Sequence, residues 1–271
     1  MSRPLWFVKL LKKAFPGRFL LAKTTKVPIL GSMLDHALFE GDDLMYLPRS
    51  GTIEINQPIN SPGEVVIPTQ VVNHFIEGAT VHWVMDTCIC RQTSQCEDYP
   101  RDLGCLFLGE AALDINPELG RRVSKEEALE HVQRCREAGL VHLIGRNKLD
   151  TVWLGVEPGI KLLTICSCCP CCCLWRVLPH VSSQIGSKIT RMPGVTVEVT
   201  DLCVGCGTCT DEVCFVDAIR LVDGRAVKSE ACRGCGRCVD VCPEGAIVIR
   251  VEDDKIVERA INHITSLVDI S

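Results

Sequence analysis

The chain has 271 residues, enough for one large domain or two smaller ones with a buried core. Its formal net charge is −5 and its aromatic fraction only 5%, which argues against nucleic-acid binding because nothing neutralises a phosphate backbone. Nineteen cysteines are the outlying number, and their spacings are those of metal ligands rather than of disulfides in a secreted protein. With no signal peptide visible, the sequence predicts a reducing, cytoplasmic setting.

Residues 5–21 combine apolar side chains with interspersed basic ones. No segment of the chain reaches the roughly 18 uncharged apolar residues of a membrane span. The stretch is therefore predicted to form an amphipathic helix, either peripheral to a membrane surface or packed on the protein's own core or on a partner. Proline and glycine recur between Pro28 and Pro68, which predicts loops and brief strands with few long helices there.

The clearest element beyond this region is a helix at 124–138. Ser124 and Glu127 match a capping box, and Gly139 stands where a C-cap glycine belongs. Hydrophobic periodicity and the positions of proline and glycine predict the other elements before the C-terminal repeat. These are helices at 69–77 and 174–185, and strands at 81–85, 141–144 and 161–165.

Residues 203–221 and 232–250 form an internal repeat. Each half contains Cys-x-Gly-Cys-Gly-x-Cys, then a further cysteine, then Ala-Ile four residues later. Thiolates at this spacing can wrap a loop around one face of an iron–sulfur cubane, and the glycines let backbone N–H groups approach its sulfides. Two structural zinc sites are the alternative, and the doubled pattern argues against them.

The repeat resembles the bacterial two-cluster ferredoxins, in which each half is a short strand, a ligand loop and a helical turn related by an approximate twofold. The resemblance implies two [4Fe–4S] clusters, with the fourth cysteine of each run ligating the other cluster. Carried over position by position, it implies two ligand sets: Cys203, Cys206, Cys209 and Cys242 for the first cluster, and Cys232, Cys235, Cys238 and Cys214 for the second.

The first half departs from the family pattern. Four residues separate Cys209 from Cys214, where the second half has three, and Phe215 replaces the proline. We expect the extra residue to bulge the loop and to alter the potential of that cluster without removing a ligand.

Eleven cysteines lie outside the repeat. Cys135 falls in the predicted helix at 124–138, where burial as a small hydrophobic residue is expected. The others form two groups: Cys88, Cys90, Cys96 and Cys105, and Cys166, Cys168, Cys169, Cys171, Cys172 and Cys173.

The string TCICRQTSQCEDYPRDLGC, the helix ending in GLVH and the run TICSCCPCCC together resemble a recurrent family of cysteine-rich Fe–S proteins of anaerobes, over about residues 80–251. That resemblance implies metal sites in both groups and supplies no reaction. The cysteine density of the second group, Cys166 to Cys173, also indicates a metal site, because six cysteines in eight residues cannot all be inert core thiols.

We expect one or two further [4Fe–4S] clusters in these groups, and one alternative is a cluster that bridges the two groups with ligands from both. Zinc remains an alternative, since tetrahedral thiolate sites accept either metal. A redox-switch disulfide, Cys168–Cys169 or Cys171–Cys173, is another. Arg91 can donate to cluster sulfides, bind an anionic substrate, or form an exposed ion pair with Glu97 or Asp98. His142 is either a ligand or proton donor, or a structural histidine.

The predicted fold class is α+β: a cysteine-rich α/β N-terminal domain followed by a ferredoxin-like, pseudo-twofold two-cluster domain. The expected divisions are an N-terminal segment (1–85), a cysteine-rich metal-cluster domain (86–192), the dicluster domain (193–251) and a C-terminal helix (252–271).

Motifs for dinucleotides, for ATP and for radical-SAM chemistry are absent, so any catalysis would occur at a cluster. The sequence favours an electron-transfer protein or subunit that works with a redox partner, either a catalytic subunit or another electron carrier. The alternatives are a small reductase with an open iron site in the N-terminal part, fed by the ferredoxin domain, and a metal- or redox-sensing module.

Overall fold

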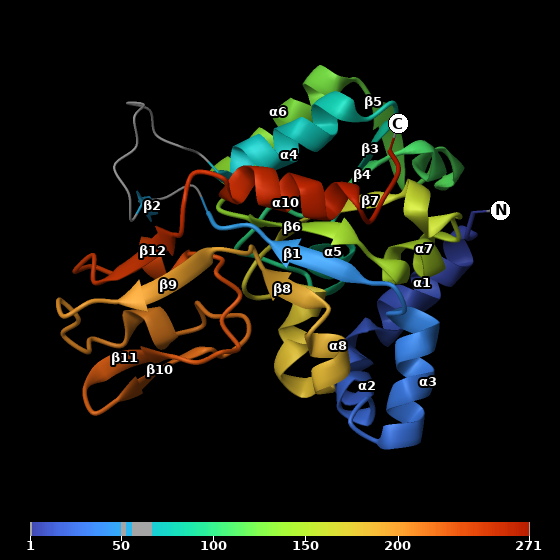
Figure 1. The fold of residues 1–271 in the computed structure, drawn as a ribbon. Helices are drawn as coiled ribbons and strands as arrows, with labels where there is room; N and C mark the ends of the chain where they lie inside the picture. Colours follow the sequence, from blue (N-terminus) through green and yellow to red (C-terminus); the bar gives the residue numbers. More distant parts are fainter. Residues whose placement is uncertain (1, 50–52, 56–66, 271) are drawn as a thin grey trace.

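The computed structural model describes residues 2–49, 53–55 and 67–270, and its fold is α+β. A seven-stranded sheet with the order β5-β3-β4-β7-β6-β1-β8 forms the centre of the described part (Figure 1). Its neighbouring strands are antiparallel except for the parallel pair β1 and β8. The strands are β1 (Asp43–Tyr46), β3 (His82–Met85), β4 (Leu106–Leu108), β5 (Gly120–Val123), β6 (Val141–Arg146), β7 (Leu163–Cys168) and β8 (Ile189–Arg191).

One face of this sheet is covered by α4 (Ile67–Gly78), α6 (Lys125–Glu137) and α10 (Ile256–Thr265) (Figure 1). Side chains alternate along a strand, so β1 sends Met45 toward these helices and Tyr46 toward the opposite face. The apolar core under the three helices continues into the C-terminal part of the chain without a break.

The opposite face carries the N-terminal helices, two short helices from the middle of the chain, and the segment after β7. These elements are α1 (Leu5–Ala14), a 3-10 turn (Phe15–Gly17), α2 (Arg18–Thr24), α3 (Pro28–Leu38), α5 (Ile89–Thr93), α7 (Lys148–Leu154), the 3-10 helix η4 (Leu174–His180) and α8 (Ser183–Gly186). Short 3-10 turns also occur at Glu110–Asp114 and Gly159–Lys161.

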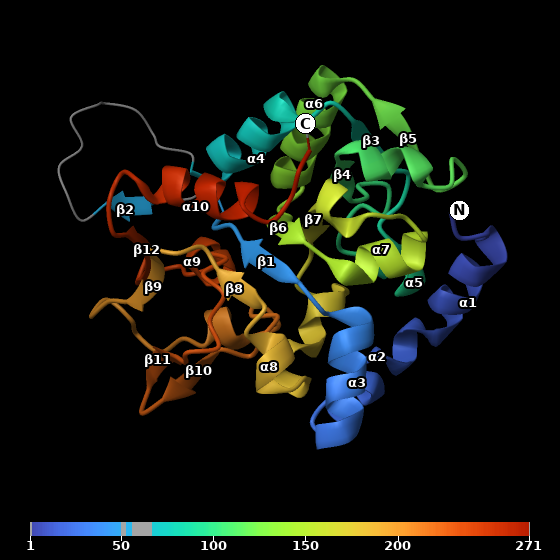
Figure 2. The same ribbon diagram turned by 45° about the vertical axis from the view of Figure 1, so that its right-hand side comes forward.

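The C-terminal cysteine repeat lies beside the end of the seven-stranded sheet (Figure 2). Its strands are β9 (Val195–Val199), β10 (Ile219–Val222), β11 (Arg225–Lys228) and β12 (Ile247–Val251), and its helical turns are η5 (Thr208–Thr210) and α9 (Arg237–Asp240). β10 pairs with β11, and β12 pairs antiparallel with β9 and parallel with β2 (Ile53–Ile55). Each half of the repeat therefore supplies two strands and one helical turn.

The helix predicted at 124–138 is confirmed, with both hydrogen bonds of the Ser124–Glu127 capping box formed and Gly139 at φ 76°. The predicted helix at 69–77 and the three predicted strands are also found, with ends shifted by a few residues. The segment 174–185 is helical but divides into η4 and α8, because Pro179 lies inside the first piece and Ser182 caps the second.

The prediction of few long helices before residue 85 is wrong at α3. Pro28 occupies the first helical turn, where its missing N–H costs nothing, so it begins a helix of 11 residues instead of interrupting one. Residues 50–52 and 56–66 of this stretch lie outside the described residues.

Candidate metal centres

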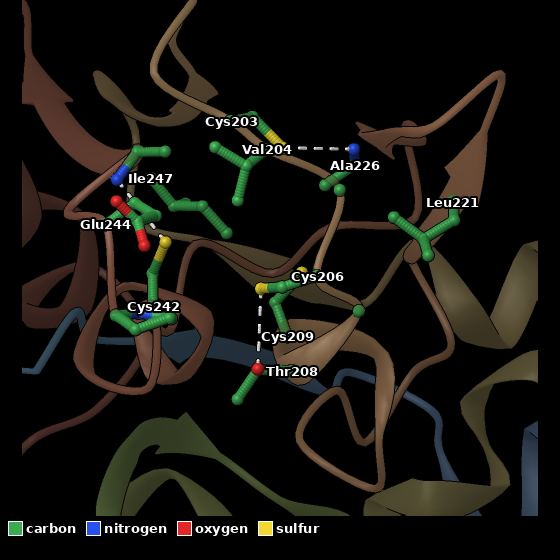
Figure 3. Close-up of a pocket in the computed structure, with 14 residues that line it drawn as sticks. Cys203, Val204, Cys206, Thr208, Cys209, Leu221, Ala226, Cys242, Glu244 and Ile247 are labelled. Carbon is green, nitrogen blue, oxygen red and sulfur yellow. Dashed lines mark hydrogen bonds between the residues drawn. The ribbon is translucent and has the colours of Figure 1, made fainter.

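The first set of repeat cysteines surrounds one pocket. Cys203 and Cys206 come from the loop between β9 and η5, Cys209 lies in η5, and Cys242 approaches from the other half of the repeat (Figure 3). Backbone N–H groups donate to two of the sulfurs, from Ala226 to Cys203 at 3.4 Å and from Ala246 to Cys242 at 3.3 Å. Cys206 is exposed, so this pocket opens to solvent.

The second set surrounds a separate pocket that lies deeper in the molecule. Cys232, Cys235 and Cys238 line it together with Cys214 from the first half. The N–H of Ala218 donates to Cys214 at 3.2 Å, which repeats the Ala246–Cys242 contact in the other half. Burial raises the pKa of Cys235 to about 11, so the free thiol is protonated at neutral pH and metal binding would release the proton.

Glycines shape both ligand loops in the same way. Gly205 and Gly207 in the first loop, and Gly234 and Gly236 in the second, all have positive φ. At Gly205 a Cβ atom would lie 1.9 Å from the carbonyl oxygen of Gly224, so no larger residue fits there. The repeat in the sequence is therefore a repeat of backbone conformation.

The irregular stretch of the first half contains Glu212 at φ 54°, a left-handed conformation that fits the expected bulge. Phe215, at the position of the second-half proline, packs against Tyr46 of β1 with ring centroids 4.8 Å apart. The departure from the repeat thus provides an aromatic contact between the C-terminal part and the central sheet.

The remaining cysteines, Cys135 excepted, divide into two sets in space that differ from the two groups in sequence. The first set is tight: the sulfurs of Cys96, Cys169, Cys171 and Cys172 all lie within 4.8 Å of one another. It joins the loop after α5 to the run that follows β7. Neither sequence group alone supplies it.

The second set lines a cavity of about 450 Å³. Cys166 and Cys168 alternate on β7 and so face the same side of the sheet as this cavity. Cys105 precedes the neighbouring strand β4, and its sulfur lies 3.5 Å from that of Cys166. The cysteines of this set are Cys88, Cys90, Cys105, Cys166, Cys168 and Cys173, and Cys169 also reaches the cavity wall.

The N-terminal helices form one wall of this cavity. Leu11, Phe15 and Leu21 line it, and the half-buried guanidinium of Arg18 lies against it. The predicted amphipathic segment at 5–21 therefore packs on the protein's own core along one side. It is not one helix, because the 3-10 turn at Phe15–Gly17 separates α1 from α2 around Pro16.

Arg91 is fully buried, and its guanidinium donates to the backbone carbonyls of Pro100, Ser167 and Leu103. The alternative in which Arg91 forms an exposed ion pair with Glu97 or Asp98 is therefore wrong. The side chain links the loop at 100–103 to β7. The guanidinium can be buried in the cavity wall because three backbone carbonyls accept its hydrogen bonds.

His142 is a buried histidine whose Nδ1 lies 3.2 Å from the hydroxyl of Ser167. Burial lowers the pKa of His142 to about 4, so the ring is neutral at neutral pH. Cys135 is also fully buried, as expected of a small hydrophobic residue, and burial raises its pKa to about 11.

Sequence reasoning missed two polar side chains near the cavity. The Tyr46 hydroxyl lies 3.9 Å from the sulfur of Cys168. Asp150 lines the cavity and accepts hydrogen bonds from Asn147, Trp153 and Thr164, while burial raises its pKa. A lone tyrosine in a short strand and a lone aspartate in a short helix carry no motif that could have signalled them.

Residues 210–252 match the family model of the LdpA Fe-S cluster-binding domain. This match includes the whole second set of repeat cysteines and Cys242 of the first. No curated protein and no solved structure matches the chain.

The matched domain and the cysteine groups identify the chain as an iron–sulfur protein. The donor sets fit that cofactor, since thiolates are the protein ligands of Fe–S clusters. Within the described part of the chain, no helix is both long and apolar enough to cross a membrane.

Proposed function

We propose that this chain is an electron-transfer protein whose repeat holds two [4Fe–4S] clusters, one in each four-cysteine pocket. The observation that carries the proposal is the crossing of the two sets: each pocket takes three cysteines from one half and one from the other. A [4Fe–4S] cluster supplies reversible one-electron exchange. The N–H groups of Ala218 and Ala246 stabilise the ligand thiolates in both pockets.

The two pockets differ in position, which supports a direction for the electrons. The first pocket opens to solvent beside exposed Leu202, Val204 and Leu221, so it suits exchange with a redox partner, a catalytic subunit or another electron carrier. The second pocket faces the central sheet, where the Arg237 guanidinium donates to the carbonyl oxygen of Cys168 at 2.5 Å.

Packed side chains join the second pocket to the large cavity. Phe215, next to the ligand Cys214, contacts Tyr46, whose hydroxyl in turn lies against Cys168 of the cavity. We infer that the cavity holds a further Fe–S cluster and that electrons pass between it and the second pocket along this contact.

A second function, a small reductase, is favoured by the size of the cavity. Its volume of about 450 Å³ and its polar groups, Arg18 and Asp150, leave room for a small polar substrate beside cysteine ligands. In this case the cavity cluster would have one iron without a thiolate ligand, and the repeat would supply its electrons.

Anaerobic purification followed by iron and sulfide analysis and EPR of the reduced protein tests these proposals. We expect about twelve irons and as many sulfides per chain, from two clusters in the repeat and one in the cavity. Fewer than about eight irons would overturn the two-cluster assignment. A count of about eight, with no third signal, would overturn the cavity cluster alone.

The same samples separate the relay from the reductase. An EPR signal that shifts when cyanide is added marks an iron open to small ligands and favours the reductase. A third signal that cyanide leaves unchanged favours the relay. In either case Phe215→Leu should slow electron transfer between the repeat and the cavity, measured by stopped-flow reduction, while Phe39→Leu, a buried aromatic residue outside this contact, should not.

We also propose that the N-terminal helices contact an anionic membrane surface. Residues 2–34 contain no acidic residue in an otherwise acidic chain. The side chains of Trp6, Leu20, Ile29 and Met33 are between 65% and 79% exposed. Apolar side chains among basic ones are the features that bind such a surface. The basic residues of this stretch are Arg3, Lys9, Lys12, Lys13, Arg18, Lys23 and Lys26.

Sedimentation with vesicles of phosphatidylglycerol tests this contact. The protein should bind these vesicles at low salt, bind phosphatidylcholine vesicles weakly, and lose binding when Trp6 and Leu10 are replaced by serine. A matched change at the exposed Leu221 and Val222 should have no effect. Equal binding by the two variants, or none by the unchanged protein, would contradict the proposal.

A further inference from the structure

The tight set of four cysteines has the dimensions of a site for one metal ion. Zinc bound by four thiolates has Zn–S distances of about 2.3 Å, which places neighbouring sulfurs about 3.8 Å apart in a tetrahedron. In the structure the sulfurs of Cys96 and Cys171 are 3.6 Å apart, and all four sulfurs lie within 4.8 Å of one another.

The repeat cysteines provide an internal comparison. Across residues 2–49, 53–55 and 67–270, no other group of three or more potential ligands has its ligand atoms within 4.8 Å of one another. Both four-cysteine pockets of the repeat are thus wider. A cubane requires this, because each cysteine binds a different iron at a different corner. The tight set is too compact for such a cluster.

The surroundings of the tight set are those of a structural site. Cys96, Cys169 and Cys172 are buried, and they pack with Leu103 and Leu140 in one apolar cluster. The N–H of Cys172 donates to the sulfur of Cys169 at 3.3 Å, a contact that stabilises a thiolate. All four positions are taken by cysteine, which leaves no open coordination position for a substrate.

We propose that Cys96, Cys169, Cys171 and Cys172 bind one structural zinc ion without bridging sulfide. The ion fastens the loop after α5 to the cysteine run after β7. Cys168 and Cys173, which flank three of the ligands, are thereby fixed in the wall of the large cavity. The site organises the cavity and takes no part in electron transfer.

Metal analysis and zinc X-ray absorption spectroscopy of the full-length protein test this assignment. We expect one zinc per chain that survives dialysis against EDTA, with a shell of sulfur neighbours at about 2.3 Å and no iron neighbour. Extra iron and sulfide in place of zinc would overturn the proposal, as would a chain that holds neither metal at these cysteines.

Two matched variants complete the test. Cys96→Ala should lower the zinc content at least about tenfold while leaving the EPR signals of the repeat unchanged. Cys135→Ala removes a thiol from the same group of buried apolar residues but leaves all four proposed ligands in place, so this variant should retain zinc. Equal zinc in the two variants would overturn the assignment.

The spectroscopy of the unchanged protein remains decisive even where Cys96→Ala does not fold. It also separates this proposal from the electron-transfer function. Loss of the repeat clusters with zinc retained would contradict only the function, and iron clusters without zinc would contradict only the zinc site.

Discussion

The cysteines of the C-terminal repeat and those of the N-terminal part reach their sites in different ways. In the repeat, three cysteines of each set come from one loop and the helical turn that follows it, with left-handed glycines in the loop, and a single cysteine comes from the other half. The tight set of the N-terminal part also takes three cysteines from one run, but its fourth, Cys96, lies 75 residues before Cys171 in the sequence. The cavity set draws on three separate segments. Local loop geometry places the repeat cysteines, whereas the N-terminal sets depend on contacts between distant segments.

The cysteine sets of the two regions also differ in the spacing of their sulfur atoms. The glycine-rich loops hold their cysteines at the wider spacing of a cluster. The sheet brings together one set that is narrow enough for a single ion and another that surrounds a large cavity. In our proposals, one chain thus combines two ways of using cysteine: electron exchange in the repeat and zinc-supported architecture beside the cavity.

The largest effect should come from removing a ligand of the second pocket. Cys238→Ala should eliminate or alter one [4Fe–4S] EPR signal and remove about one to four irons per chain, since three thiolates leave one iron of the cluster without a protein ligand. Iron analysis and EPR of the reduced protein measure this. Cys96→Ala is the matched change in the tight set and should cost no iron. If both variants lose iron, the comparison between the two regions fails.

The role of glycine in the repeat can be tested by comparing two glycines. Gly205→Ala should lower the free energy of unfolding by more than about 3 kcal/mol, because it combines a left-handed conformation with a backbone clash. Gly224→Ala, also at positive φ but with no atom within 4 Å of the new Cβ, should cost about 1 kcal/mol.

Anaerobic thermal unfolding followed by circular dichroism measures both glycine variants. Similar losses would show that the close approach of the two backbones is unimportant.

In the N-terminal part the corresponding test is Arg91→Lys. Lysine keeps the charge but cannot reach three carbonyls in three directions, so about 3 kcal/mol of stability should be lost. Urea unfolding under argon measures it. Arg121→Lys changes a side chain that is 62% exposed and should cost less than about 0.5 kcal/mol. Equal effects would mean that the cavity wall does not depend on Arg91.

The smallest expected effect concerns pH. The pKa of His142 is about 4 in the fold, below its ordinary value of about 6.5, so the unfolded chain binds the proton more readily. The part of the folding free energy that depends on a neutral His142 is fully present above about pH 6.5 and is lost as the pH falls toward 4. Between about pH 8 and pH 5.5 this loss should amount to about 1.4 kcal/mol.

Urea unfolding at these two pH values measures the pH effect. His142→Gln should flatten the dependence, whereas His36→Gln, at a side chain 77% exposed, should leave it in place. An unchanged dependence in His142→Gln would contradict the assignment.

Where local rules apply, the sequence predicts the structure well. The capping box defines the start of α6 through hydrogen bonds between residues three apart, so no distant contact is needed. The strand predicted at 161–165 is also found, but β7 continues to Cys168, so the shared face of Cys166 and Cys168 is a result of the structure. Pro28 is the exception, because a proline can begin a helix as readily as it can interrupt one, and local sequence leaves both open.

The repeat and the iron–sulfur character of the chain can be read from the sequence alone, because the spacing of cysteines within a loop survives in any fold that the loop adopts. The assignment of each fourth cysteine to the other half came from the resemblance to the two-cluster ferredoxins, since spacing within a loop does not specify it. How the N-terminal cysteines divide and what Arg91 does follow from the tertiary structure. Those outcomes depend on which strands become neighbours: the pairing of β4 with β7 brings Cys105 to Cys166 across 61 residues of sequence. Such neighbours follow from packing of the whole sheet, which no spacing along the chain encodes.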